Sequence, residues 1–162
     1  MRNAIRRTCL LVVIPMLAAA CGRASPSGYA PELGELMILQ QVRHTKLWFA
    51  AEAGNWPLAL YEIGELGEGF DAVIKYHPIK EESPVAPQDA IPRMIMEPLA
   101  SLREAVNKQD RSLFVERYDA LTTACNNCHR ATNVGFNRVQ RPETNPYPDQ
   151  DFSAERQEPL SP

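Results

Sequence analysis

The chain has 162 residues, of which 44% are hydrophobic, and its formal net charge at pH 7 is −3. This length and composition predict one globular domain with a single hydrophobic core. No stripe of basic residues runs along the chain, which argues against binding of nucleic acid.

The first twenty residues have the pattern of an export signal. Three arginines within the first seven residues precede a short apolar run over 10–17, and the small residues 18–20 form a cleavage site. The apolar run is too short to span a membrane as a helix. Cys21 follows directly, and Ala-Ala-Ala-Cys resembles the lipobox of bacterial lipoproteins. Residues 1–20 are therefore interpreted as a signal peptide and Cys21 as the lipidation site, with ordinary cleavage beside a free cysteine as the alternative.

Removal of residues 1–20 takes away three arginines and no acidic residue, so the expected mature protein carries a net charge of −6. An acidic surface does not attract anionic lipid headgroups, so the lipid is the expected membrane attachment. Residues 21–31 are rich in Gly, Ser and Pro and are expected to form a flexible tether. We therefore expect a periplasm-facing protein that is anchored by lipid to a membrane of the bacterial cell envelope.

Apolar residues recur at steps of three and four through residues 32–131, which predicts amphipathic helices. The four expected helices span residues 32–53, 55–77, 92–107 and 110–131. Asn55 and Asp110 are the expected N-caps of the second and fourth helices. Residues 78–91 are expected to form a loop, and Pro98 either breaks the third helix or marks its true start. Two short connections favour an all-α fold, an antiparallel four-helix bundle.

The most informative stretch is Cys125-Asn126-Asn127-Cys128-His129. Two cysteines separated by two residues and followed by histidine form the attachment signature of a c-type haem. Positions i and i+3 share one face of a helix, so both thiols can form thioether bonds to one edge of the porphyrin. The adjacent imidazole of His129 is then the expected proximal ligand of the iron.

Three other interpretations of this motif agree less well with the sequence. A zinc site needs four ligands, but the remaining cysteines, Cys9 and Cys21, lie in or at the end of the export signal. A thioredoxin-like redox pair follows a strand, whereas the residues before Cys125 have a helical pattern. A structural disulfide between Cys125 and Cys128 closes only a very small loop and stabilises little. One covalently bound haem c is therefore the expected cofactor.

The last stretch, residues 132–162, contains five prolines and has no helical periodicity. It is expected to be an extended tail. Phe136, Tyr147 and Phe152 favour a tail that lies on the domain, and a disordered tail is the alternative.

Four helices with this pentad near the end of the last one resemble the class II c-type cytochromes, the cytochrome c-prime group. The resemblance covers about residues 32–131, and only Cys125, Cys128 and His129 match a specific motif. It implies thioether bonds from both cysteines and proximal ligation by His129. The Pro-rich tail and the lipid anchor depart from the small soluble members of that group.

The sixth iron ligand is left open by the sequence. The resemblance implies a distal residue about three turns into the first helix, which falls near His44. Met37, Met94, Met96 and His77 lie at the same end of the expected bundle and are the rival candidates. An empty or water-filled distal site is the remaining possibility.

The expected function is single-electron transfer by a monohaem cytochrome. The alternative is a five-coordinate haem protein that binds or senses a diatomic gas such as NO or CO, and a lipoprotein with an incidental motif is a third reading. No nucleophile set or phosphate-binding loop is present, and we do not expect an enzyme. An acidic run on the second helix is interpreted as a solvated face or as the docking patch for a redox protein. Its members are Glu62, Glu65, Glu68 and Asp71.

Overall fold

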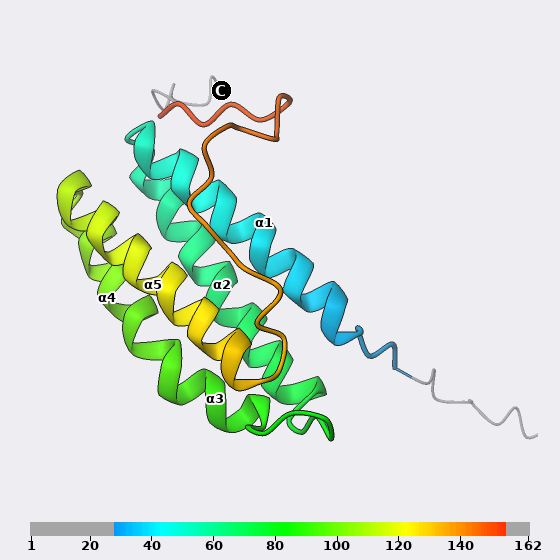
Figure 1. Ribbon diagram of the computed structural model, residues 1–162. Coiled ribbons are helices and arrows are strands. Elements are labelled where there is room, and N and C mark those ends of the chain that lie inside the picture. Colours follow the sequence, from blue (N-terminus) through cyan, green and yellow to red (C-terminus); the bar gives the residue numbers. More distant parts are fainter. Residues whose placement is uncertain (1–27, 155–162) are drawn as a thin grey trace, which may run out of the picture.

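The computed structural model describes residues 28–154 and contains five α-helices (Figure 1). They are α1 (Leu33–Glu52), α2 (Trp56–Tyr76), α3 (Pro87–Met94), α4 (Met96–Asn107) and α5 (Arg111–Ala131). The predicted signal peptide and the lipidation of Cys21 lie outside the described residues. Within residues 28–154, none of the helices has both the length and the apolar composition required to cross a membrane.

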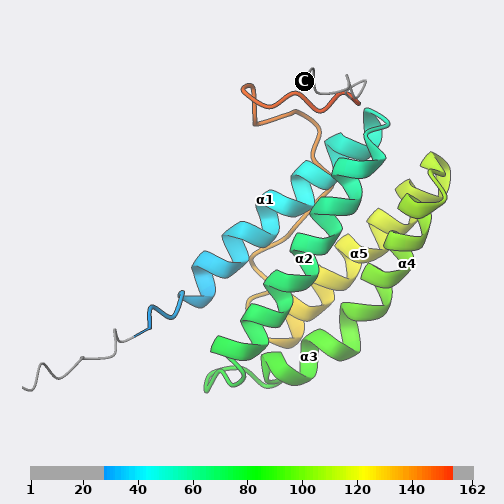
Figure 2. The same ribbon diagram turned by 180° about the vertical axis from the view of Figure 1, so that it is seen from behind.

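The described part of the chain is all-α, and four helical rods pack against one another (Figures 1 and 2). α1, α2 and α5 each form one rod, and α3 continues into α4 to form the fourth. The end of α5 therefore lies at the same end of the molecule as the start of α1, the end of α2 and α3. The predicted all-α class is confirmed. The arrangement of the helix ends brings residues near 35, 73 and 128 together.

The predicted end of the third helix at residue 107 is confirmed, but its predicted start at residue 92 was wrong. The loop ends at Ala86 rather than at residue 91, because Pro87 stands in the first turn of α3, where its missing N–H costs nothing. The rod then breaks at Ile95, between α3 and α4. Pro98 explains this break, since it has no N–H to donate to the carbonyl oxygen of Met94.

The N-caps were predicted correctly. The Asn55 side chain accepts a hydrogen bond from the backbone N–H of Leu58 at 3.1 Å, and Asp110 accepts one from Leu113 at 3.0 Å. Both caps satisfy N–H groups that have no partner within their own helix. Each cap therefore ends a short connection that turns the chain back on itself.

One glycine of α2 allows α1 to approach closely. A Cβ atom on Gly69 would lie 2.2 Å from Oε1 of Gln40, whose Nε2 donates to the Leu66 carbonyl oxygen at 2.8 Å. A Cβ atom on Gly64 would have no neighbouring atom within 4 Å. Of these two glycines, only Gly69 is therefore approached closely by a side chain of α1, that of Gln40.

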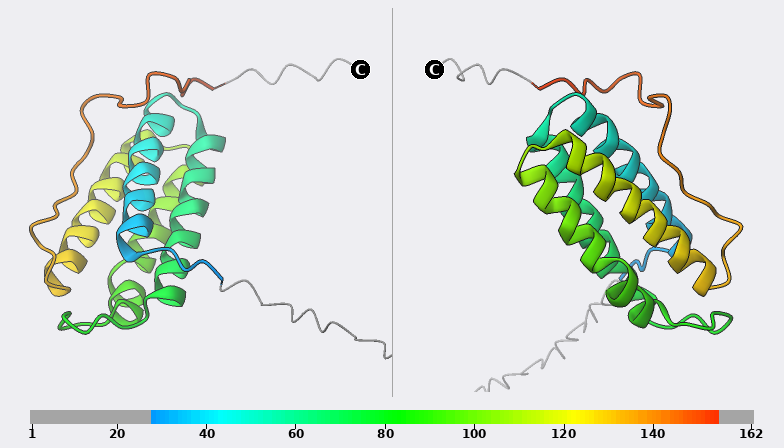
Figure 3. Two further views of the ribbon diagram at one scale, coloured as in Figure 1. Left: turned by 90° about the vertical axis from the view of Figure 1, so that its right-hand side faces the viewer. Right: turned by 60° about the vertical axis from the view of Figure 1, so that its left-hand side comes forward.

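The chain reverses direction directly after α5. Asn133 adopts the left-handed conformation, with a φ of 60°. The N–H of Val134 donates to the His129 carbonyl oxygen at 2.8 Å, and that of Asn133 donates to Arg130 at 3.3 Å. These two bonds form a Schellman motif, which ends the helix and satisfies its last carbonyl groups. The tail consequently runs back along the bundle instead of away from it (Figure 3).

Two of the three tail aromatics pack on the domain as expected. Phe152 is buried and lies 5.8 Å, between ring centroids, from Phe49 of α1. Tyr147 is half-buried, with Nζ of Lys46 5.3 Å from its ring centroid. Phe136 is 88% exposed, so the expectation that it anchors the tail was wrong.

Candidate functional site

Cys125, Cys128 and His129 occupy the last two turns of α5 and line one cavity of 310 Å³. This volume is at the lower end of the range of small-molecule sites, roughly 300–1,000 Å³. The two sulfur-bearing residues are one helical turn apart, so both face the cavity. The motif singled out in the sequence is therefore at a cavity wall.

The rest of the cavity wall is largely apolar and comes from α1, α2, α3, Ile95 and the chain that follows α5. α1 and α2 contribute four apolar side chains, and α3 with Ile95 closes the far side. These side chains are Leu33, Met37, Phe70, Val73, Pro87, Ile91 and Ile95. Such a lining favours a mainly apolar group.

The two cysteines are free thiols in an apolar setting. Burial is the main cause that raises the pKa of Cys125 to about 12, and burial also raises the pKa of Cys128. A redox-active or nucleophilic cysteine has a lowered pKa, because the thiolate is the reactive form. Across the described residues, no three His, Cys, Asp or Glu side chains form a group that could bind a bare metal ion.

The imidazole of His129 has one nitrogen engaged. Its Nδ1 lies 2.6 Å from the carbonyl oxygen of Asn137 in the tail. A carbonyl oxygen can only accept, so Nδ1 carries the proton and donates it. Nε2 is then the unprotonated nitrogen that has a lone pair available for a metal.

Of the five candidates for a distal ligand, Met37 is the one that lines the 310 Å³ cavity. Met94 and Met96 are half-buried and pack against the core. The Nε2 of His77 lies 2.8 Å from the Pro31 carbonyl oxygen, at the C-cap of α2. This hydrogen bond ties the end of α2 to the segment before α1 and accounts for His77 without any ligand role.

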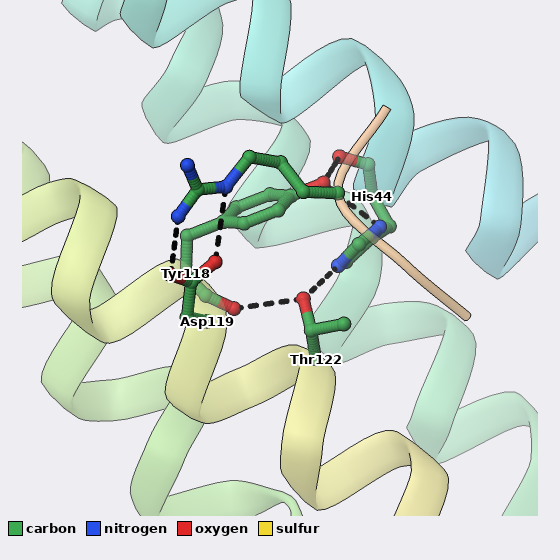
Figure 4. A network of polar contacts seen from close by, with 5 residues as sticks. His44, Tyr118, Asp119 and Thr122 are labelled. Atoms are coloured by element: carbon green, nitrogen blue, oxygen red, sulfur yellow. Dashed lines mark hydrogen bonds and ion pairs between the residues drawn. The ribbon is translucent and has the colours of Figure 1, made fainter. Parts of the chain in front are cut away.

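His44 is 4% exposed and lies inside the bundle, between Tyr118 and Thr122 of α5 (Figure 4). Its Nε2 is 2.9 Å from Oγ1 of Thr122, and its Nδ1 is 2.9 Å from the hydroxyl of Tyr118. It also lines a smaller cavity of 50 Å³ that includes Met37 and Cys125.

Two hydroxyl groups and the ring form one closed network. The Thr122 hydroxyl lies 2.9 Å from both Nε2 of His44 and the Tyr118 carbonyl oxygen, and the Tyr118 hydroxyl lies 2.9 Å from both Nδ1 and the His44 carbonyl oxygen. In a neutral ring one nitrogen donates to its hydroxyl and the other accepts from its hydroxyl. Burial lowers the pKa of His44 to about 4, which agrees with a neutral ring. Both ring nitrogens are thus engaged within the bundle, and ligation by His44 would require this network to break.

The acidic run of α2 is divided by the fold. Glu62 is 4% exposed, and burial raises the pKa of its carboxyl group. Glu65 pairs with Arg43 of α1 at 3.0 Å, while Glu68 and Asp71 are exposed. The interpretation of the whole run as a solvated face is therefore wrong for Glu62.

The contribution of the tail to this site was not predicted from the sequence. Thr132, Val134, Phe136 and Asn137 line the cavity beside the motif, and the Asn137 carbonyl oxygen holds the imidazole. The only available signal was Asn133, a residue that tolerates the left-handed turn at a helix end.

Comparison with protein-family models, with curated proteins and with solved structures finds no match to this chain.

Proposed function

We propose that the protein is a monohaem c-type cytochrome that transfers single electrons in the bacterial cell envelope. The observation that carries this proposal is the common cavity of Cys125, Cys128 and His129. The residues fit the group in three respects: two thiols one turn apart, an imidazole with Nε2 available, and an apolar wall.

In this proposal Cys125 and Cys128 hold the haem through thioether bonds, and Nε2 of His129 is the proximal ligand. The bound haem supplies a one-electron iron couple. The apolar side chains of the cavity wall would surround the haem, and the Asn137 carbonyl oxygen fixes the tautomer of His129. The raised pKa of Cys125 supports a structural attachment point rather than a dithiol redox site.

We further propose Met37 rather than His44 as the distal ligand. Met37 lines the cavity, and its thioether sulfur carries no proton that competes with a metal. Both ring nitrogens of His44 are instead hydrogen-bonded, to Tyr118 and Thr122. If Met37 does not bind, the distal wall is apolar, and the five-coordinate gas-binding protein becomes the function to consider.

The attachment is tested with the full chain produced together with haem-maturation machinery. The purified protein should carry one haem mass and show a c-type visible spectrum, and the double variant Cys125→Ser/Cys128→Ser should lose all covalent haem. Cys9→Ser is the matched control, because Cys9 lies in the predicted signal peptide. Wild-type protein without covalent haem would refute the proposed function.

The distal ligand is tested by visible spectra of the oxidised, reduced and CO-treated holoprotein. Met37→Leu keeps the volume of the side chain but removes its sulfur, so it should convert low-spin iron to high-spin iron that binds CO. Met94→Leu and His44→Gln should leave the spin state unchanged. A low-spin spectrum in Met37→Leu that is lost in His44→Gln would restore His44 as the ligand.

A further inference from the structure

The tail is held against α5 at three successive points. Residues 134–154, called here the strap, run back over the junction of α1 and α5 (Figure 3). The strap contacts α5 through positions 137, 139 and 141, which alternate as in an extended chain. Their partners on α5 are His129, Asn126 and Asp119, whose spacing of three and seven residues places them along one stripe of the helix.

Asn126 makes the central contact. Its Nδ2 donates to the Val139 carbonyl oxygen at 2.8 Å, and its Oδ1 accepts from the Val139 N–H at 2.8 Å. The amide group thus pairs with both polar groups of one strap residue, as a neighbouring strand would. A slip of the strap by one residue would lose both bonds, so Asn126 sets its register against α5.

The position of Asn126 links this register to the candidate iron ligand. Asn126 lies inside the Cys-x-x-Cys-His motif, three residues before His129. Asn137 lies two residues before Val139 and presents its carbonyl oxygen to Nδ1 of His129 at 2.6 Å. Any shift of Val139 along α5 therefore moves the acceptor that orients the imidazole.

Arg141 secures the next point of the strap. Its Nε donates to Oδ1 of Asp119 at 3.1 Å, and its second nitrogen donates to Oδ2 of the same carboxylate. The guanidinium carbon lies 4.6 Å from the ring centroid of Trp48 in α1. Both partners of the ion pair are exposed, so this contact alone contributes little, but it ties the strap to two helices at once.

The far end of the strap is anchored at the opposite end of the molecule. Phe152 is buried against α1, and Nδ2 of Asn55 donates to the Ser153 carbonyl oxygen at 3.0 Å. The strap is thus fixed on both sides of the segment that faces the motif.

We propose that the strap is a positioning device for His129, with Asn126 as the residue that sets its register. This inference rests on the proposed function, because His129 needs positioning only if it binds iron. The strap holds Nδ1–H on the Asn137 carbonyl oxygen and leaves the lone pair of Nε2 available for a metal. A hydrogen bond from the far nitrogen also makes the imidazole a stronger electron donor.

The register is tested by hydrogen exchange of the Val139 amide in the full-length holoprotein. In Asn126→Ala this amide loses its acceptor and should exchange about tenfold faster than in wild type. Asn127→Ala is the matched control, because it removes the same side chain from the same motif at an exposed position. Asn126→Asp keeps the oxygen that accepts from Val139 and should retain most of the protection. Equal exchange in Asn126→Ala and Asn127→Ala would overturn the proposal.

The positioning role is tested by the reduction potential and by the NMR signals of the His129 ring. Loss of the hydrogen bond to Asn137 weakens the donor, which favours ferrous iron, so Asn126→Ala should raise the potential while Asn127→Ala should not. Arg141→Gln lies outside the motif and should shift both readouts in the same direction by a smaller amount. If the exchange rate changes but the potential and ring signals do not, the strap is only structural and the proposal fails.

The experiments distinguish failure of the proposed function from failure of the proposed positioning role. A wild-type chain without covalent haem would refute the proposed function, whatever the exchange rate of Val139. A haem-loaded wild type whose potential is insensitive to Asn126→Ala would refute only the positioning role.

Discussion

The two ends of the helical domain are packed differently. At the end formed by the α1–α2 connection, Trp48, Phe114 and Tyr118 stack with ring centroids 5.0 to 6.0 Å apart, and Phe114 and Tyr118 are fully buried. At the opposite end, α5 presents Cys125 and Cys128 to a cavity of 310 Å³. Aromatic rings fill the first end, whereas mainly aliphatic side chains line the cavity at the second.

This difference predicts where substitutions change stability. A protein interior normally contains few voids larger than a water molecule, so an apolar cavity of this size lowers stability unless something occupies it. The aromatic end needs no ligand to be complete. We therefore expect substitutions at the aromatic end to act on folding and substitutions at the cavity end to act on binding of the proposed haem.

The largest effect is expected at the aromatic end. Phe114→Ala removes a fully buried ring that contacts Trp48, Trp56 and Tyr118, and it should lower the free energy of unfolding by about 3–5 kcal/mol. Urea denaturation of the haem-free and haem-loaded protein measures this loss.

Ile91→Ala is the matched substitution at the cavity end. Ile91 borders a space with no contacting atoms on that side, so the haem-free variant should lose only about 2 kcal/mol. An equal loss in Phe114→Ala and Ile91→Ala would contradict the distinction between the two ends.

The next effect is the dependence of stability on pH, which we expect from His44 and its hydrogen bonds to Tyr118 and Thr122. His44 has a pKa of about 4 in the folded protein and an ordinary value of 6.5 when unfolded. The unfolded chain therefore binds more protons between these values, so stability is complete above pH 6.5 and is lost as the pH falls toward 4. The loss should reach about 3 kcal/mol, measured by urea denaturation at several pH values.

The variant His44→Gln isolates the contribution of His44. Burial raises the pKa of the Glu62 carboxyl group, so Glu62 changes stability with pH in the opposite sense. The contribution of His44 is therefore the difference between the pH profiles of wild type and His44→Gln. A profile that is identical in wild type and His44→Gln would show that the buried ring does not control acid stability.

The smallest effect concerns the contact of α1 with α2. Gly69→Ala places a Cβ atom 2.2 Å from Oε1 of the buried Gln40, and it should destabilise the protein by about 1–3 kcal/mol. Gly64→Ala has open space at the same position and should instead stabilise by up to about 1 kcal/mol, because alanine is the better helix former. Thermal unfolding of both variants measures the difference, and effects of the same sign would contradict it.

Local patterns were sufficient to predict most helices. The three- and four-residue recurrence of apolar side chains identified α1, α2 and α5, and side chains that bond to nearby backbone N–H groups identified the caps at Asn55 and Asp110. The start of α3 was missed because a proline can either end a helix or occupy its first turn. The sequence around Pro87 agrees with both roles. In the structure Pro87 stands in the first turn of α3, where it lines the cavity.

By itself the sequence determined the all-α class, most helix boundaries and the pairing of Cys125, Cys128 and His129 on one segment, because these depend on neighbours within a few residues. The tertiary structure decided that Met37 faces the cavity while His44 is enclosed by Tyr118 and Thr122, and that the strap returns to Asn126. Helical periodicity shows which residues share a face, but the rotation of one helix against another determines what that face meets. Contacts such as His44 with Thr122, 78 residues apart, follow only from the packing of the whole chain.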